Sequence, residues 1–297
     1  RPACGYVATC PNCSISLTYH SANRRLMCHY CGYSEEQPSK CPQCGSETVR
    51  FLGVGTRKVE EELRSLFPSA RIVRMDADST MTRDSYTKYL SAFSAGEYDI
   101  MLGTQMVAKG LDFPNVTVVG VIGADRATYS EDYRGFERTF SLLTQVVGRA
   151  GRAGGEGRAV IQTVDPHNSV ISLACRQDYE AFYNEEIMTR RVMVLPPFCD
   201  ICVICVQSAD RGAADGALRE IFGRIRSLIS EDYKDVHTII LGPAVAAVPK
   251  ISNRYRYRLT VKCRDNRRFR DMLRQAIDIK LSRDVSVSVD INPETVI

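Results

Sequence analysis

The sequence predicts an α/β domain with a cysteine-rich module ahead of it and an α+β domain after it. In the middle of the chain, short apolar runs alternate with amphipathic stretches, which is the pattern of a parallel sheet covered by helices. Seven of the twelve cysteines fall within the first 44 residues. After a Pro-Pro pair at 196–197 the pattern changes again. We therefore place the domain boundaries at residues 1–48, 49–192 and 193–297.

The composition is that of a globular protein. At 297 residues, of which 44% are hydrophobic, the chain is long enough for two or three domains. The net charge of +4 is small, so any nucleic-acid surface must come from local clusters of Lys and Arg. No apolar run reaches the roughly 20 residues that cross a bilayer, and no signal-peptide pattern opens the chain. These features predict a cytoplasmic protein with no membrane partner.

Most of the early cysteines form C-x-x-C pairs. The pairs are Cys10 with Cys13, Cys28 with Cys31, and Cys41 with Cys44, while Cys4 stands alone. Such a turn brings two thiolates onto one tetrahedral zinc ion, and a glycine after the second cysteine, here Gly32 and Gly45, lets the backbone bend around the metal. Disulfides and free thiols are the alternatives, but the clustering favours zinc in a reducing compartment.

One zinc ligand is missing from the pattern. Two four-coordinate sites need eight ligands, and this segment holds seven cysteines. The pair-mate of Cys4 would fall at Arg1 or just upstream, and Arg does not bind zinc. Either the chain begins within the motif, or His20, His29 or a water completes the second site. Closed sites of this kind support folding rather than catalysis.

The middle segment predicts alternating strands and helices. The expected strands are 49–54, 71–75, 98–102, 116–122 and 158–163. The expected helices include 57–67, which Pro68 ends, and 82–94.

Two segments of this domain carry candidate chemistry. Residues 102–114 (LGTQMVAKGLDFP) follow a strand, and ligands bind at the carboxyl ends of strands in open α/β sheets. Residues 145–152 (QVVGRAGR) place Arg149 and Arg152 three positions apart, on one side of a helix. Two guanidinium groups suit a polyphosphate whose charge grows during transfer. A solvated helix end explains the same residues equally well, because cations suit the helix dipole there and glycines break the helix.

Together the two segments resemble motifs V and VI of the two-lobed helicases of superfamily two. With the cysteine module directly ahead of them, the chain resembles the PriA family of replication-restart helicases, also called primosomal protein N-prime. The stretches GTQMVAKGLDFP and GRAGRAGGEG match that family almost letter for letter. The resemblance covers the whole chain. It implies a RecA-like second helicase lobe, with ATP bound between this lobe and a first one.

The resemblance also implies a role for each motif residue. Arg149 and Arg152 would reach the γ-phosphate, Gln145 and Gly148 would shape the cleft, Gly110 and Asp112 would contact the nucleotide, and Thr104 would touch a DNA phosphate. The family's cysteine pairs are nested. This nesting implies one zinc site of Cys10, Cys13, Cys28 and Cys31 and a second that includes Cys4, Cys41 and Cys44.

The ATP-binding elements of the family have no counterpart in the sequence. It contains no Gly-x-x-x-x-Gly-Lys-Ser/Thr and no Asp-Glu-x-His after a buried strand, so the phosphate cradle and the magnesium ligand have no candidates. In the family both lie on the first lobe. We therefore expect ATP and magnesium only in the intact two-lobed protein, and no ATPase activity from this chain alone. Asp125 has the placement of a magnesium-binding Asp but no cradle to act with.

Residues from 193 onward predict the order β-α-β-β-α-β, which is ferredoxin-like. The expected elements are strand 199–207, helix 213–229, strands 237–241 and 255–263, helix 267–279 and strand 285–291. Cys199, Cys202 and Cys205 lie in an apolar run without turn residues. Like the isolated Cys175 and Cys263, they are expected to be buried core cysteines.

Positive charge gathers near the end of the chain. It alternates with apolar residues along 254–262 and continues through 264–274. Such a cluster binds DNA phosphates or an acidic protein tail, or it is a solvated sheet face that discourages edge pairing. The family resemblance favours the acidic tail of single-stranded DNA-binding protein, with Arg267 and Arg270 as the expected contacts.

The leading hypothesis is the C-terminal portion of an ATP-dependent 3′-to-5′ DNA helicase. The resemblance implies that it recognises stalled replication forks and assembles the restart primosome, with forked and single-stranded DNA, zinc and other primosome proteins as partners. One alternative is a docking module with no role in ATP hydrolysis. Another is a donor of Arg149 and Arg152 in trans to a partner ATPase.

Overall fold

The computed structural model describes residues 4–20, 23–46, 55–76, 83–108, 113–125, 132–148 and 157–295. The chain forms two compact units, one of residues 1–51 with 187–297 and the other of residues 52–186. The first unit therefore joins segments from both ends of the chain. The three sequence-based domain boundaries remain predictions. Within the described residues, no helix is both long and apolar enough to cross a membrane.

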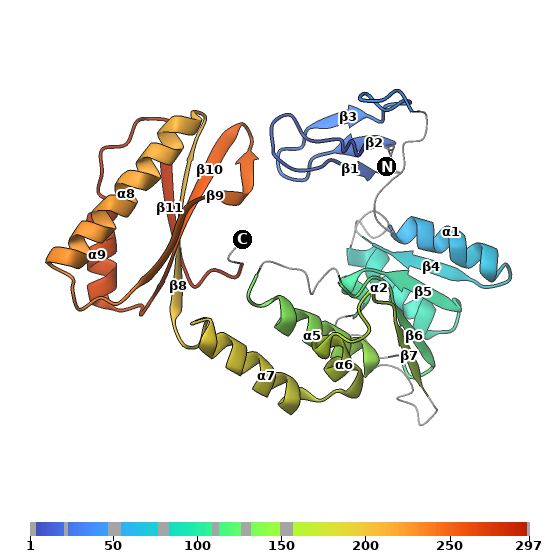
Figure 1. Cartoon of the computed structure of the whole chain (residues 1–297). Helices are drawn as coiled ribbons and strands as arrows, with labels where there is room; N and C mark the ends of the chain where they lie inside the picture. Colours follow the sequence, from blue (N-terminus) through green and yellow to red (C-terminus); the bar gives the residue numbers. More distant parts are fainter. Residues whose placement is uncertain are drawn as a thin grey trace. The chain divides into compact units, whose positions relative to one another are not determined.

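The N-terminal part of the first unit is a small antiparallel sheet. Its strands are β1 (Thr18–His20), β2 (Arg25–Met27) and β3 (Ser34–Glu36), in the order β1-β2-β3 (Figure 1). Each strand is three residues long. The buried residues around this sheet are mostly cysteines, namely Cys10, Cys13 and Cys28, which form a cluster. The thiols thus occupy the place of an apolar core.

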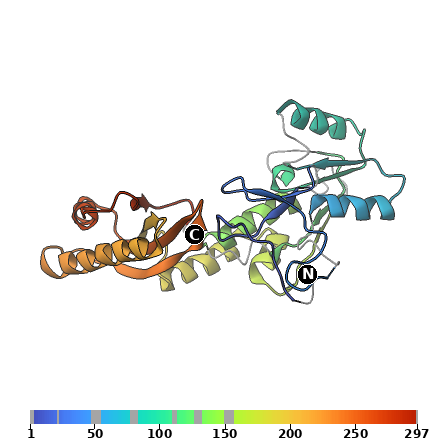
Figure 2. The ribbon, with the colours of Figure 1, turned by 90° about the horizontal axis from the view of Figure 1, so that it is seen from above.

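The remainder of the first unit has the predicted β-α-β-β-α-β order. Its elements are β8 (Asp200–Ser208), α8 (Arg211–Glu231), β9 (Ile239–Ile251), β10 (Arg254–Cys263), α9 (Arg267–Ile277) and β11 (Ser286–Ile291). The sheet order is β11-β8-β10-β9, all antiparallel, as in a ferredoxin-like fold. Helices α8 and α9 contact one another and share a core with the sheet (Figure 1, Figure 2).

Local sequence explains the helix starts in this domain. Asp210 accepts a hydrogen bond from the N–H of Ala213, and Asn266 accepts one from the N–H of Phe269. Apolar side chains of both helices then face the sheet, and the largest fully buried ones include Leu218, Ile221, Ile225, Phe269 and Met272. The predicted class and element order of this domain are confirmed.

Strand β9 is much longer than the predicted strand 237–241. It continues to Ile251 without a break. Gly242 and Pro243 together lie opposite a single residue of β10, so the pairing contains a bulge at this point but is not interrupted. Gly242 adopts a φ of 104°, which only glycine tolerates well. The Gly-Pro signal therefore marks a bulge rather than the end of the strand.

The second unit contains parallel strands and helices. Its elements are α1 (Thr56–Leu66), β4 (Ile72–Met75), α2 (Arg83–Ser94), β5 (Ile100–Gly103), α3 (Gln105–Ala108), β6 (Val118–Val121), α5 (Gly135–Val147), β7 (Arg158–Ile161) and α6 (Ser169–Arg176), and α7 (Tyr179–Val192) follows. Strand β4 pairs with β5, and β6 pairs with β7, both in parallel. The predicted α/β class is confirmed, whereas the predicted strand 49–54 lies outside the described residues.

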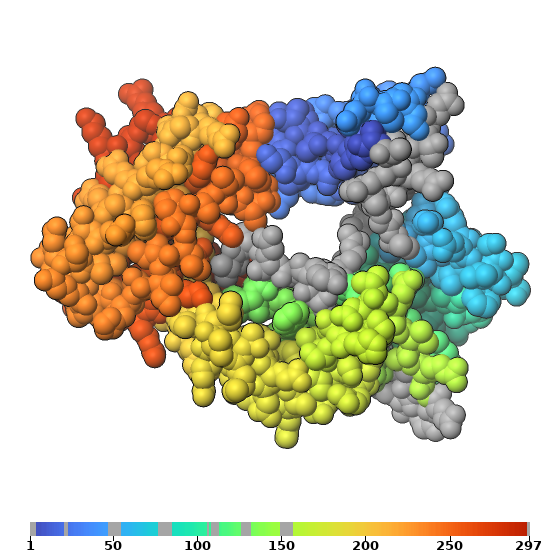
Figure 3. All heavy atoms as spheres, in the orientation of Figure 1, coloured from blue at the N-terminus to red at the C-terminus, as the bar shows by residue number. Residues whose placement is uncertain are grey.

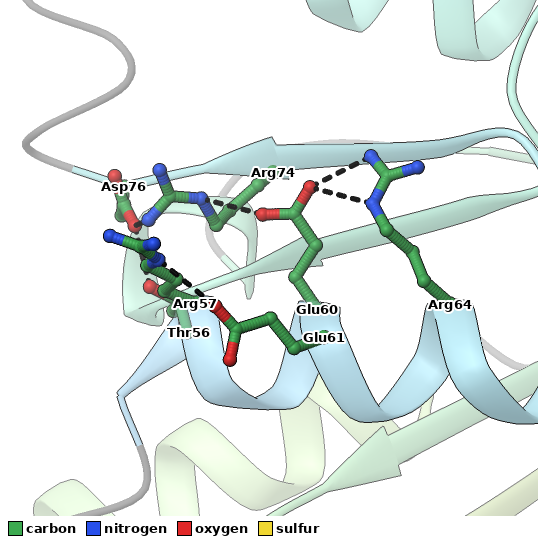
Figure 4. A network of polar contacts seen from close by, with 7 residues as sticks. All are labelled: Thr56, Arg57, Glu60, Glu61, Arg64, Arg74 and Asp76. Carbon is green, nitrogen blue, oxygen red and sulfur yellow. Dashed lines mark hydrogen bonds and ion pairs between the residues drawn. The ribbon is translucent and has the colours of Figure 1, made fainter.

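A network of ion pairs attaches helix α1 to strand β4 (Figure 4). Arg74, on β4, contacts Glu60 of α1 at 3.0 Å and Asp76 at 2.7 Å. Thr56, at the start of α1, donates to the same Asp76 carboxylate at 2.5 Å, and Arg64 pairs with Glu60 at 2.8 Å. Asp76 is 7% exposed. The start of α1 is therefore fixed beside the carboxyl end of β4.

The carboxyl end of β5 requires glycine. A Cβ atom at Gly103 would lie 2.7 Å from the backbone oxygen of Met75 and equally close to the side chain of Val107. No side chain fits at such a separation without a shift of backbone.

We expect Gly103→Ala to destabilise the second unit by about 1–3 kcal/mol, the usual cost of overpacking. The matched control is Gly120→Ala on β6, where an added Cβ meets nothing within 4 Å. That change should be neutral or stabilising by about 0.5–1 kcal/mol, since alanine is the less flexible residue in a strand. Urea unfolding of both variants measures the difference, and equal stability would contradict the close approach.

Candidate zinc centres and helicase motif segments

The first cysteine cluster has the geometry of a zinc site. The sulfur atoms of Cys10, Cys13, Cys28 and Cys31 all lie within 4.8 Å of one another, and those of Cys10 and Cys31 are 3.6 Å apart. Tetrahedral ligation at about 2.3 Å places sulfur atoms about 3.8 Å apart, whereas a disulfide requires about 2.05 Å. These residues fit zinc, and the grouping is the one that the nested family pattern implied.

The second cluster joins Cys4 with Cys41 and Cys44. Their sulfur atoms also lie within 4.8 Å of one another, with 3.6 Å between Cys4 and Cys41. Within the described residues this group contains neither His20 nor His29, whose rings instead contact each other with centroids 5.0 Å apart. The three cysteines fit three of the four positions of a tetrahedral zinc ion.

Two of the three C-x-x-C turns close on themselves through glycine. Gly32 has a φ of 75° and donates its N–H to the oxygen of Cys28 at 3.0 Å. Gly45 repeats this with a φ of 70° and a bond of 2.9 Å to Cys41. The left-handed conformation costs little free energy only for glycine, so the predicted role of both glycines in these turns is confirmed.

The thiols of the first cluster differ in acidity. Burial raises the pKa of Cys13 to about 12. Burial acts in the same direction on Cys28, but the N–H groups of Cys31 and Tyr30 reverse it and bring its pKa to about 7. Zinc binds thiolates, so loading this cluster releases protons, and its zinc affinity falls as pH falls.

The other cysteines lie away from both clusters. Cys202 and Cys263 are buried, as expected, while Cys199 and Cys205 are partly exposed. The expectation for Cys175 is wrong, because this residue is exposed. It lies near the end of α6, whose buried face is made by other residues, namely Val170, Ile171, Leu173 and Ala174.

Helix α3 belongs to the first motif segment, and helix α5 leads into the second. Thr104 directly follows β5, and its carbonyl oxygen accepts the N–H of Val107 as α3 begins. Gln145 lies exposed in the last turn of α5, and Gly148 caps that helix with an N–H donated to Thr144. Helix α3 contacts α5. Gly110, Asp112, Arg149 and Arg152 lie outside the described residues.

Asp125 has a structural role at the end of β6. Its carboxylate accepts the hydroxyl of Thr163 at 2.5 Å and the N–H of Val164 at 2.9 Å. The Thr163 hydroxyl, together with the Val164 N–H, holds the pKa of Asp125 below its usual range despite burial. Asp125 therefore fixes the loop that follows β7.

Sequence reasoning missed Asp132, which organises the start of α5. Its side chain is buried and contacts Arg138 at 3.1 Å, and its carbonyl oxygen accepts the N–H of Gly135. The only signal in the sequence is an acidic residue shortly before an amphipathic helix.

The basic residues of the C-terminal domain are partly paired. Arg270 forms two hydrogen bonds with Asp265, the shorter of 2.6 Å, and Arg254 pairs with Asp284 at 2.9 Å. The side chain of Arg267 is 97% exposed. Between α9 and β11 lies a shallow groove lined by Arg270, Leu273, Arg274, Ile277, Val289 and Ile291. Four of these lining residues are apolar and two are arginines.

Comparison with family models assigns three regions of the chain. Residues 10–35 match the PriA DNA helicase Cys-rich region domain, residues 46–154 match the helicase conserved C-terminal domain, and residues 191–294 match the primosomal protein N C-terminal domain.

Curated relatives match nearly the whole chain. The replication restart protein PriA of Bacillus subtilis is 43% identical over 294 residues, which is 98% of this chain and 36% of the relative. PriA of Chlamydia trachomatis is 38% identical over 299 residues, 99% of this chain and 39% of the relative. PriA of Synechocystis is 38% identical over 264 residues, 88% of this chain and 31% of the relative. The chain thus spans about a third of these relatives.

The fold and the cysteine clusters define a helicase C-terminal domain combined with a zinc module of the PriA type. The chain belongs to the PriA family of replication restart proteins.

The zinc grouping has a direct test. Cys28→Ser should lower the zinc content of the purified chain by about one equivalent, because it removes one of four ligands from the first site. Cys175→Ser is the matched control, since this exposed thiol lies outside both clusters. Metal analysis by mass spectrometry measures both. Zinc content that is unchanged in Cys28→Ser would contradict the first site.

Proposed function

We propose that this chain supplies the second motor lobe of an ATP-dependent 3′-to-5′ DNA helicase. That helicase recognises forked and single-stranded DNA at stalled replication forks and assembles the restart primosome. The observation that carries the proposal is the contact between α3, which follows Thr104, and α5, which carries Gln145 and Gly148. Helix α3 lies in the first motif-like segment and α5 leads into the second, and α3 follows the carboxyl end of β5, the end at which α/β sheets bind ligands, which supports the proposal.

The proposed chemistry is phosphoryl transfer in which this lobe contributes charge and position. Arg149 and Arg152 reach the γ-phosphate, where guanidinium groups stabilise the charge that develops during transfer. Gly110 and Asp112 contact the nucleotide, Gln145 and Gly148 shape the cleft, and Thr104 contacts a DNA phosphate. A first lobe supplies the phosphate cradle and the magnesium ligand. Zinc bound by the cysteine clusters, the second of which supplies three ligands, holds the module of residues 4–46 in its fold.

ATP hydrolysis tests this proposal. The purified chain should show no turnover with or without single-stranded DNA, and addition of a first helicase lobe should restore it. In the restored system Arg152→Ala should reduce turnover by about 10³–10⁵, the range known for arginine fingers. The control is Arg176→Ala, an exposed arginine at the end of α6.

Each result of this assay has a defined meaning. Turnover by the chain alone that disappears in Arg152→Ala would overturn the proposal, because the chain would then hold a complete site. Unchanged turnover in Arg149→Ala and Arg152→Ala, with the first lobe present, would favour a docking module instead. Restoration of turnover in a different ATPase would favour donation of the two arginines in trans.

The groove between α9 and β11 is the proposed docking site for the acidic tail of single-stranded DNA-binding protein. Its apolar lining residues accept apolar side chains, while the lining residues Arg270 and Arg274 and the neighbouring Arg267 offer positive charge. Arg270 is paired with Asp265 at 2.6 Å, whereas Arg267 lies 3.8 Å from Asp271 and its side chain is 97% exposed, so Arg267 is the more accessible contact.

A peptide titration measures this docking. Arg267→Glu should weaken binding of a labelled tail peptide about fivefold, since one exposed ion pair contributes up to about 1 kcal/mol and the new charge repels the peptide. Arg283→Glu, an exposed position of the same domain, introduces the same charge change as a control. Equal weakening by the two variants, as read by fluorescence anisotropy, would indicate attraction to net charge rather than a site.

A further inference from the structure

A hairpin of the C-terminal domain contacts the zinc module. Strands β9 and β10 are joined by the two residues Ser252 and Asn253, and hydrogen bonds join the hairpin tip, Lys250–Asn253, to the Cys10–Cys13 turn. In Figure 3 the orange atoms of this part of the chain touch the blue atoms of the N-terminal module. The contact joins positions separated by about 240 residues of sequence. Both partners belong to the same compact unit.

The Cys10–Cys13 turn differs from the other two C-x-x-C turns. After Cys31 and Cys44 comes a left-handed glycine whose N–H bonds back to the first cysteine of the pair. After Cys13 comes Ser14, whose N–H instead donates to the carbonyl oxygen of Lys250 at 3.0 Å. The hairpin thus accepts the hydrogen bond that the other turns satisfy internally.

The hairpin also reaches the ligand atom itself. The N–H of Ser252 donates to the sulfur of Cys13 at 3.2 Å. The side chain of Ile251 packs against the cluster of Cys10, Cys13 and Cys28. A backbone N–H directed at a thiolate stabilises its negative charge and fixes its orientation.

Polar contacts on either side align the two partners. The Lys250 ammonium group donates to the carbonyl oxygen of Pro11 at 2.8 Å. Asn253 donates its backbone N–H to the carbonyl oxygen of Asn12 at 2.8 Å and its side-chain amide to the Asn12 side chain at 3.2 Å. Every residue from Pro11 to Ser14 therefore has a hydrogen bond to the tip.

The tip is constrained by its own hairpin. Ser252 and Asn253 have φ values of 49° and 61°, the left-handed pair typical of a tight two-residue hairpin turn. The strands behind it are 13 and 10 residues long and are anchored in the main core of the domain. The N–H of Ser252 is consequently held in place at little cost in entropy when the two parts meet.

We propose that the Lys250–Asn253 hairpin tip is a positioning element of the first zinc site. The tip does not bind zinc itself, but it holds the Cys13 sulfur in the orientation that zinc binding requires. In the other two turns a glycine has this role. Zinc binding by Cys10, Cys13, Cys28 and Cys31 and docking of the C-terminal domain are therefore thermodynamically linked, each raising the affinity of the other. The second cluster has no part in this linkage.

Two pairs of variants test the role of the tip. Ser252→Pro removes the N–H donor, whereas Ser252→Gly keeps it and tolerates the left-handed conformation. Ile251→Asp places a carboxylate against the thiolates, whereas Ile251→Leu keeps the apolar contact. All four are made in the full chain with Cys44→Ser added. This background substitution weakens the second cluster further, so that the zinc affinity measured is that of the four-cysteine cluster.

Competition with a chromophoric zinc chelator then measures zinc affinity. We expect Ser252→Pro and Ile251→Asp to lower it by about 10–100-fold, the usual effect of removing an outer partner of a zinc ligand. Ser252→Gly and Ile251→Leu should match the parent. Cobalt(II) substitution gives a second readout, because the sulfur-to-cobalt charge-transfer bands report thiolate ligation and the d–d bands report the coordination geometry.

A purely structural role of the turn would give a different result. In that case Ser252→Pro would lower the melting temperature of the C-terminal domain but leave zinc affinity and the cobalt spectrum unchanged. If Ser252→Pro does not fold, Ile251→Asp against Ile251→Leu decides the question alone, since that pair leaves the turn residues intact. Equal zinc affinity within either folded pair overturns the proposal.

Discussion

The thiolate cluster of Cys10, Cys13, Cys28 and Cys31 is the constraint on which the N-terminal zinc module depends. The strands around it are three residues long and bury few apolar side chains, so they cannot offset the conformational entropy of ordering the module. Metal ligation supplies the folding free energy that apolar burial does not supply, because the free energy of zinc binding contributes directly to folding in a module of this size. The cluster then fixes the Cys10–Cys13 turn, and that turn is the surface on which the β9–β10 hairpin rests.

The C-terminal domain and the second unit are stabilised by different kinds of interaction. The C-terminal domain is held by a continuous apolar core between two helices and four antiparallel strands. The second unit uses parallel pairs whose carboxyl ends are tied by buried carboxylates, Asp76 beside β4 and Asp125 beyond β6. Both carboxylates follow the carboxyl ends of parallel strands, the end at which ligands bind in this class of fold, and they fix the local structure there.

Much of the fold could be predicted from periodicity. The β-α-β-β-α-β order, the parallel class of the middle domain and the glycines after Cys31 and Cys44 follow from local rules, and the structure agrees. The same rules placed Cys175 in a core and ended a strand before Gly242, and both predictions were wrong. Exposure of one helix face and tolerance of a bulge depend on what the neighbouring strand or helix provides, which local sequence does not specify.

The sequence by itself determined the chemistry of the zinc ligands, the positions of the helicase-like segments and the membership of the chain in its family. Only the tertiary structure decided that α3 meets α5 and that the first zinc turn is completed by a hairpin about 240 residues away. The reason is physical. Spacing along the chain encodes contacts within a turn or a helix, whereas a bond between the Ser252 N–H and the Cys13 sulfur exists only once two separately folded surfaces have packed together.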